Sequence, residues 1–306
     1  MKKQDPEQLL QKAMALGNAI REIESIDVDR SYEKTMRKAK RSKRMELYQS
    51  LMKYAAFFSL PLLMTSLVLG WMYFSKPDSA ERYAEVISAN GSIMRYELPD
   101  HSVVWLNSGS KLRYPVVFQE DRRNVELTGE AYFEVEADKE RPFYVNMTDG
   151  LKVYVYGTKF NVSAYGDDTS IETVLEKGKV NVITPQAKEL VLNPGERVLY
   201  NRESGQWTKD KVDVYEKVAW KDGKLIFRNA SLDEIFKRLS RHFNVDIELS
   251  NRYNREYRYR ATFRNETLPQ ILDYLAQSAR MKWQLHNGSQ QDDNTLSRKK
   301  VTVVLY

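Results

Sequence analysis

The residues that could do chemistry are few in this chain of 306 residues, and their spacing matches no common catalytic or metal site. The absence of cysteine excludes disulfides and thiolate metal ligands. Three scattered histidines, His101, His242 and His286, share no ligand motif. Glu134 and Glu136 fall on one face of an expected strand, as acid/base chemistry would need, but a solvated strand face produces the same pair. With no hydrolase triad, phosphate loop, HExxH helix or nucleotide fingerprint, the sequence predicts a protein that is not an enzyme and uses no metal or cofactor.

The longest apolar stretch, residues 54–74, determines where the other elements must lie. It has no charged side chain over about twenty residues, the length that a helix needs to cross a bilayer. It is longer than a signal-peptide core, starts far from the N-terminus and has no A-x-A site at its end, which favours an uncleaved anchor. The sequence therefore predicts a single-pass membrane protein with one transmembrane helix in the lipid bilayer.

The charges on either side of this stretch predict its orientation. Residues 34–53 contain eight Lys and Arg side chains and one acid, whereas Lys76, Asp78 and Glu81 follow the apolar stretch. The positive-inside rule then places the N-terminus in the cytoplasm and the C-terminus in the periplasm, with the anchor in the inner (cytoplasmic) membrane. This cluster contributes eight minus one, or +7, against a net charge of +6 for the whole chain, so the rest of the chain is close to neutral. We therefore expect the cluster to reflect topology and anionic lipid rather than direct nucleic acid binding.

Residues 1–53 are expected to form a short α-helical cytoplasmic segment. From residue 5 to 24, apolar positions alternate in spacings of four and three and make one seam on a helix. A second helix, capped by Asp27 or Asp29, is expected from about Ser31. The segment has too few large apolar groups to close its own core. Two interpretations remain open: a tail held at the membrane by its charges, or a module that binds another protein through the seam. The seam residues that would make that contact are Leu9, Leu16, Ile20 and Ile23.

Beyond a polar linker over residues 75–84, the apolar pattern changes to a period of two, which predicts an all-β domain over residues 85–214. The strand-like runs are residues 103–106, 116–118, 125–127, 131–135, 143–145 and 153–156. Turn residues separate these runs, and Gly129 is expected to divide the two runs on either side of it. Strict alternation indicates sheets that are covered on one face.

An internal repeat marks the last part of the chain. Residues 227–239, FRNASLDEIFKRL, align without gaps on residues 263–275, FRNETLPQILDYL. Two copies predict an α+β C-terminal domain with two βαβ repeats over residues 215–306. Ser231 with Glu234 and Thr267 with Gln270 have the spacing of capping boxes, so both helices should start at equivalent places. The strands beside these helices are expected at residues 224–227, 245–249, 257–263, 282–285 and 300–305.

Four blocks of the β domain resemble the FecR family of membrane-anchored sigma-factor regulators, in the same order. They are LPDHSVVWLNSGSKLRYP, VELTGEAYFEVEADKERPFYV, VYGTKFNV, and VLEKGKVNV followed by LNPGE, and the match covers roughly residues 85–200. One departure is His101, where the family usually has glycine. Histidine tolerates positive φ better than most residues, so the turn should survive with some strain. The C-terminal domain is similar to one found in a branch of FecR-like proteins, itself like short N-terminal domains of secretins and TonB-dependent receptors.

The resemblance implies a function as well as a fold. It implies a transmembrane anti-sigma factor whose cytoplasmic segment holds an ECF-type sigma factor. Its periplasmic domains would receive a signal from a TonB-dependent outer-membrane transporter. Because relatives often carry a longer cytoplasmic region, an alternative remains open: an envelope scaffold with periplasmic interaction domains and no sigma partner.

The resemblance also singles out Gly157 and Thr158 in VYGTKFNV, because some FecR-like proteins are thought to cut themselves at a Gly-Thr step. A threonine hydroxyl can attack the carbonyl before it and turn the amide into an ester that water opens, provided that the backbone is bent. Glycine permits such bending. The alternative interpretation is that Gly157 makes a β-bulge and Thr158 fills an ordinary strand position.

Overall fold

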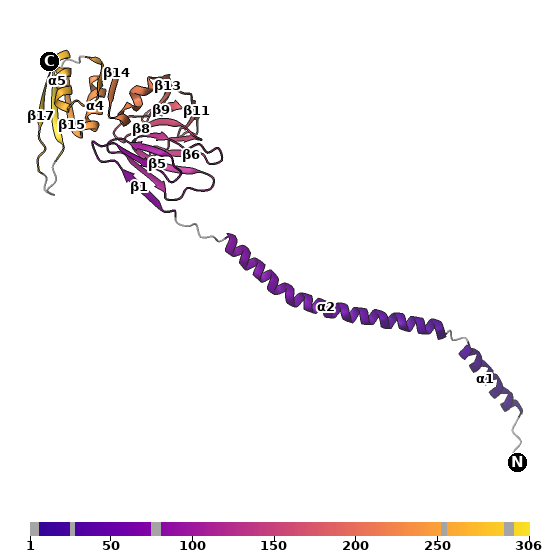
Figure 1. Ribbon diagram of the computed structural model, residues 1–306. Coiled ribbons are helices and arrows are strands. Elements are labelled where there is room, and N and C mark those ends of the chain that lie inside the picture. The colour runs from indigo at the N-terminus through magenta and orange to yellow at the C-terminus, as the bar shows by residue number, and fades with distance from the viewer. Residues whose placement is uncertain (1–5, 25–27, 75–80, 252–255, 291–296) are drawn as a thin grey trace. The chain divides into compact units, whose positions relative to one another are not determined.

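The computed structural model describes residues 6–24, 28–74, 81–251, 256–290 and 297–306. The chain divides into two bodies, Met1–Ser79 and Ala80–Tyr306. The first body is helical, and the second contains all of the described strands (Figure 1).

Two helices make up the first body, α1 at Pro6–Glu24 and α2 at Val28–Phe74. The helix predicted for residues 5–24 is confirmed, and the second helix begins at Val28 rather than near Ser31. The expected cap Asp27 lies outside the described residues. Helix α2 continues from the basic segment through Pro61 without a break. Its window Phe57–Phe74 is long and apolar enough to cross a membrane, and none of it is buried. One such helix is compatible with the predicted single-pass architecture.

The second body begins with a β-sandwich of two mostly antiparallel layers. The first layer has the strand order β1-β4-β5-β6-β7-β10-β11, and the second has the order β2-β3-β5-β8-β9-β12-β13. The strand bounds are β1 Tyr83–Ile87, β2 Met94–Glu97, β3 Val103–Leu106, β4 Lys111–Pro115, β5 Arg123–Glu134, β6 Phe143–Met147, β7 Lys152–Val155, β8 Lys159–Ala164, β9 Ser170–Lys177, β10 Val180–Ile183, β11 Glu189–Leu192, β12 Glu196–Asn201 and β13 Trp207–Lys211. Alternate residues point into the shared core, where the rings of Phe133 and Phe160 stack at 5.0 Å. This arrangement follows from the period-two pattern, because one face of each layer is covered by the other.

Strand β5 belongs to both layers because it bends at Gly129. Its first half pairs with β4 and β6, and its second half pairs with β3 and β8. Gly129 has φ +96°, and a Cβ there would lie 2.8 Å from Ser110 Cα. The expectation that Gly129 ends one strand and starts another is therefore wrong. The glycine lets a single strand pass from one layer to the other.

The predicted strand at residues 116–118 is also wrong, because β4 ends at Pro115. Residues 116–122 form a loop between β4 and β5, and they are referred to below as the 116–122 loop. Proline has no backbone N–H, so it favours the end of a ladder over its middle. In contrast, the expected turn at His101 is confirmed. His101 adopts φ +66° and its Nδ1 lies 3.0 Å from Glu97 Oε1.

A short helix α3 (Val214–Val218) and a 3-10 turn η1 (Ala219–Asp222) lead from the sandwich into the C-terminal domain. The remaining elements are β14 Leu225–Ser231, α4 Leu232–Phe243, β15 Val245–Asn251, β16 Arg258–Phe263, α5 Leu268–Ser278, β17 Met281–His286 and β18 Lys299–Leu305. Both predicted helices begin where expected. Ser231 Oγ accepts a hydrogen bond from the Glu234 N–H at 3.2 Å, and Gln270 Oε1 accepts one from the Thr267 N–H at 2.8 Å.

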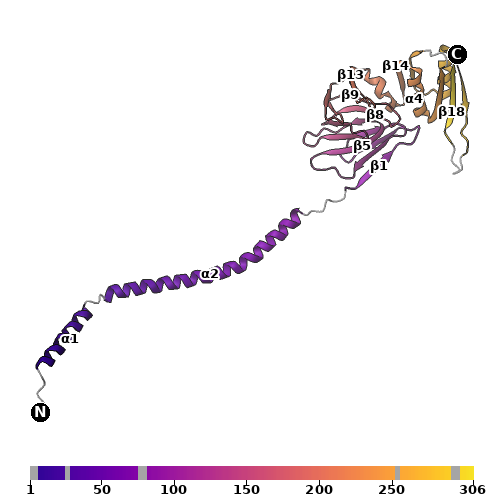
Figure 2. The same ribbon diagram turned by 180° about the vertical axis from the view of Figure 1, so that it is seen from behind.

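The repeat is confirmed in its order of elements but not in its strand pairing. The two strands of each copy lie in different sheets, because β14 pairs antiparallel with β16 while β15, β18 and β17 form a separate sheet. Each copy therefore has the predicted order of strand, helix and strand, but its two strands do not form a βαβ unit within one sheet. Helix α4 contacts both β14 and β15, so its apolar face is covered by the two sheets together. Figure 2 shows β14 and α4 between the sandwich and β18.

Candidate functional site

The Gly157–Thr158 step lies where the chain passes from one layer of the sandwich to the other. It connects β7 of the first layer with β8 of the second, and neither residue is part of a strand. Gly157 has φ +146°, and a Cβ there would lie 2.7 Å from Ala137 Cα. Only glycine fits this position without displacing the neighbouring backbone. The step is therefore a crossing between two layers with the bent backbone that the sequence suggested.

The Thr158 side chain is buried, with 4% of its surface exposed, and its hydroxyl is engaged. Thr158 Oγ1 donates a hydrogen bond to the Lys179 carbonyl at 3.1 Å, and the Thr158 carbonyl accepts one from the Val135 N–H at 3.0 Å. A Cβ at Gly178 would lie 2.9 Å from Thr158 Oγ1, so the hydroxyl sits close against a second glycine. Because the hydroxyl donates its proton to the Lys179 carbonyl, the lone pairs of Oγ1 remain available for attack.

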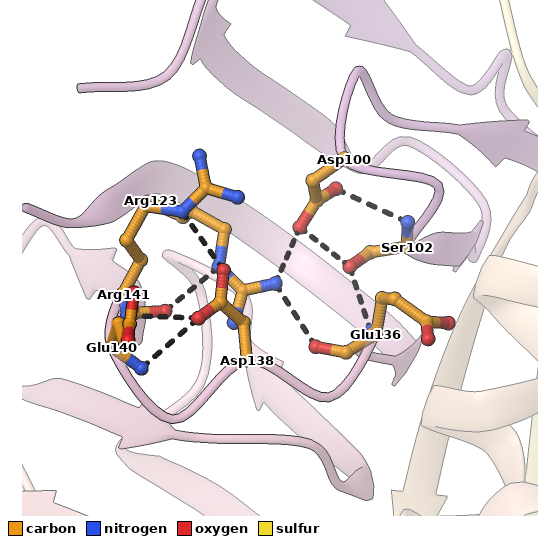
Figure 3. Close-up of polar contacts among 7 residues, drawn as sticks. All are labelled: Asp100, Ser102, Arg123, Glu136, Asp138, Glu140 and Arg141. Carbon is orange, nitrogen blue, oxygen red and sulfur yellow. Dashed lines mark hydrogen bonds and ion pairs between the residues drawn. The ribbon is translucent and has the colours of Figure 1, made fainter. Parts of the chain in front are cut away.

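A buried ion pair supports the segment that packs against this step (Figure 3). Arg123 and Asp100 have side chains 1% and 7% exposed, and Arg123 Nη1 lies 2.8 Å from Asp100 Oδ2. Arg123 also donates to the carbonyls of Glu136 and Arg141, each at 3.0 Å. Ser102 Oγ donates to Asp100 at 2.8 Å and accepts from the Glu136 N–H at 3.0 Å. The main chain of Glu136 is thus held at both its N–H and its carbonyl.

The residues after Glu136 contact Gly157 and its neighbour Tyr156. Ala137 is the residue that the Gly157 backbone approaches, and the Asp138 N–H donates to the Tyr156 carbonyl at 2.9 Å. Glu134, predicted to share a face with Glu136, instead forms an ion pair with Lys159 at 3.0 Å. The Glu134 carboxylate is thus paired with Lys159, and the Glu136 side chain is exposed.

A second polar cluster joins the sandwich to the C-terminal domain. Arg241 of α4 donates to Asp168 Oδ2 at 3.1 Å and to Asp167 Oδ1 at 2.8 Å, and its guanidinium lies 3.8 Å from the centre of the Tyr165 ring. Ser108 Oγ donates to the Arg241 carbonyl at 2.7 Å. Arg241 and Asp167 are 74 positions apart in the sequence, and no motif marks either of them. This cluster cannot be predicted from the sequence, because no local pattern contains it.

Beside this cluster lies a polar cavity of about 260 Å³, lined by both domains. Burial raises the pKa of the Glu130 carboxyl, although Asn161 and Asn107 donate hydrogen bonds to it at 2.9 and 2.7 Å. Burial and the neighbouring Arg238 charge lower the pKa of His242, which disfavours its charged form. Among the described residues, no group of three or more His, Asp or Glu side chains could hold a metal ion. In this cavity, Glu130 is thus hydrogen-bonded by two asparagines, and the neutral form of His242 is favoured.

The seam of α1 faces solvent wherever its side chains are described. Leu16 is 66% exposed and Ile20 is 51% exposed. The side chains of Leu9 and Ile23 lie outside the described part of the structure. Two of the predicted partner-binding residues, Leu16 and Ile20, therefore lie on adjacent turns of α1 and expose apolar surface.

Two family models match this chain. The model described as FecR protein matches residues 84–181, and the model described as FecR, C-terminal, matches residues 224–291. Two solved structures of a candidate anti-sigma factor from Parabacteroides distasonis ATCC 8503 are 29% identical to the chain, each with a TM-score of 0.62. One match covers 73% of this chain and 98% of that one, and the other covers 74% and 99%. None of the curated proteins matches this chain.

Proposed function

Because the chain belongs to the FecR family, we propose that it is an anti-sigma factor that relays a signal from a TonB-dependent outer-membrane transporter to a cytoplasmic ECF-type sigma factor. The observation that carries the proposal is the pair of family matches, one on the sandwich and one on the C-terminal domain, together with the similarity to a candidate anti-sigma factor over nearly its whole length. The cytoplasmic part of the proposal rests on the exposed seam of α1. The proposed relay from the transporter is supported by the match of the C-terminal domain to its family model and by membership of the FecR family.

We place the protein in the inner membrane with its N-terminus in the cytoplasm. The eight basic residues before the apolar segment support this orientation, because positively charged flanks stay on the cytoplasmic side. A reporter that is active only in the periplasm should work when fused after Thr208 and stay silent when fused after Asp29. A reporter active only in the cytoplasm should give the opposite pattern at the same two sites. If the periplasmic reporter works only after Asp29, the topology and the direction of signalling are both wrong.

The relay requires the C-terminal domain to receive the signal. This domain has free sheet edges within its described residues, since β15 and β17 each pair only with β18. Such edges can bind a partner by adding a strand. A chain that ends after Gly223 keeps Trp220, which donates from its indole Nε1 to Asn161 Oδ1 at 3.2 Å within the sandwich. We expect this truncated protein to reach the membrane at normal abundance but to give no sigma-dependent transcription when the transporter is loaded with its ligand. Normal induction would contradict the relay.

We also propose that the Gly157–Thr158 bond can cleave itself. The Thr158 Oγ1 would attack the Gly157 carbonyl carbon, the C–N bond would break to give an ester and a free amine, and water would open the ester. The bent backbone at Gly157 supports this proposal. The two products should remain associated, because β8 pairs with β5 and β10 pairs with β7 across the cut.

Purified protein should therefore give two bands only after denaturation, with a new N-terminus at Thr158. Thr158→Ala should give one band, because the nucleophile is gone. Thr158→Ser keeps a hydroxyl at the same position and should still cleave, which separates loss of the nucleophile from loss of the fold. A single intact wild-type band, with no N-terminus at Thr158 by mass spectrometry, would leave the step as a structural crossing.

A further inference from the structure

The 116–122 loop presents apolar side chains to solvent. Val117 is 78% exposed, more than any other large apolar side chain described in residues 81–306, and its neighbour Val116 is 49% exposed. Two adjacent exposed valines at a strand end contribute nothing to the core of the sandwich. They are available for a contact outside the domain.

The loop is fixed so that the valines point outward. The next residue, Phe118, packs against the core, with its ring centre 6.2 Å from that of Phe143. Arg122 Nε donates to Gln119 Oε1 at 2.7 Å and closes the turn. With Phe118 partly buried against the core beside it, Val117 cannot turn inward without displacing that aromatic ring.

The loop lies at the point where the chain enters the sandwich. The Val116 N–H donates to the Arg82 carbonyl at 2.8 Å, and Gln119 bonds to the Glu81 carboxylate. Tyr83, 39% exposed, pairs with Pro115 at the end of β4. Because α2 ends at Phe74, the covalent chain limits the distance from the end of α2 to Tyr83 to about 30 Å, whatever the arrangement of the two bodies.

We propose that Val116, Val117 and Tyr83 form a membrane contact, in which the valines enter the periplasmic surface of the bilayer. This inference rests on the membrane anchorage given under the proposed function. Tyrosine favours the headgroup level, and valine favours the acyl region beneath it. The charges near the loop are mixed, and they are those of Glu81, Arg82, Glu120, Asp121 and Arg122. The attraction is therefore apolar and does not depend on anionic lipid.

The absence of cysteine allows a direct test, since one introduced cysteine is the only site for a thiol-reactive probe. Full-length Val117→Cys is labelled with the environment-sensitive dye NBD and reconstituted in phosphatidylcholine vesicles. The matched control is Val191→Cys on β11, which is 39% exposed and lies at the edge of the same layer opposite to β1. Flotation of the labelled protein with the vesicles shows whether the anchor is inserted, independently of the environment of the 116–122 loop.

The probe at position 117 should emit at shorter wavelength and lose about half of its emission to lipids with nitroxide-labelled acyl chains, as expected for a group just below the headgroups. The probe at position 191 should respond to aqueous iodide and not to the nitroxide lipids. Adding Val116→Asp should reduce the lipid quenching at position 117, whereas salt or phosphatidylglycerol should leave it unchanged. If the protein floats but position 117 is quenched by iodide like position 191, the membrane contact is wrong and the anchor stands. If the protein does not float, the anchor itself is wrong and the contact falls with it.

Discussion

Replacing Leu16 and Ile20 together with aspartate should abolish co-purification of the sigma factor with the full-length protein. Both side chains are more than half exposed on α1, so the change should not disturb a core of this protein. In the complex, each new carboxylate would be buried without a partner, at a cost of several kcal/mol. The measurement is affinity purification from solubilised membranes of the native host, with the bound sigma factor identified by mass spectrometry.

The matched control for this experiment is Met14→Asp. Met14 is 62% exposed, and at 100° per residue it lies on the far side of α1 from Leu16 and Ile20. This variant adds a carboxylate to the same helix but leaves the seam intact, so binding should persist. If the double variant still binds the sigma factor as the wild type does, the seam is not the binding surface. If the wild type brings down no sigma factor, the envelope scaffold becomes the better description.

Replacing Arg123 with methionine should lower the free energy of unfolding of residues 81–306 by about 3–5 kcal/mol, the usual cost of removing one partner from a buried ion pair. The change would leave the Asp100 carboxylate, 7% exposed, without its cation. It would also remove the donors to the carbonyls of Glu136 and Arg141 (Figure 3). Urea unfolding of this compact body would measure the loss.

An exposed ion pair provides the comparison. Lys300 and Glu248 pair at 2.6 Å with side chains 48% and 63% exposed, so Lys300→Met should cost less than about 1 kcal/mol. If Arg123→Met lowers the free energy of unfolding no more than Lys300→Met does, the buried pair does not stabilise the segment that packs against Gly157. If Arg123→Met shows the expected loss, the same variant can be checked for slower cleavage at Thr158.

Patterns that repeat locally were sufficient to predict several features from the sequence. The apolar segment around Pro61 and the seam through Leu16 are periodic or continuous over neighbouring residues, and the structure has helices at both. The turn at His101 and the caps at Ser231 and Thr267 depend on residues a few positions apart, and they too lie where expected. The FecR resemblance, carried by ordered blocks of such residues, agrees with the two family matches.

Only the tertiary structure decided which distant segments meet. A glycine between two strand-like runs, such as Gly129, has the same local signal whether the chain reverses or bends. The pairing of β14 with β16 likewise depends on how α4 packs against two separate sheets, one containing β14 and the other containing β15. Arg123 and Asp100 are 23 positions apart, and Arg241 and Asp167 are 74 apart. Whether such charges end in water or in a buried pair depends on packing by other segments, because burial is a property of the assembled layers and not of a residue's neighbours in sequence.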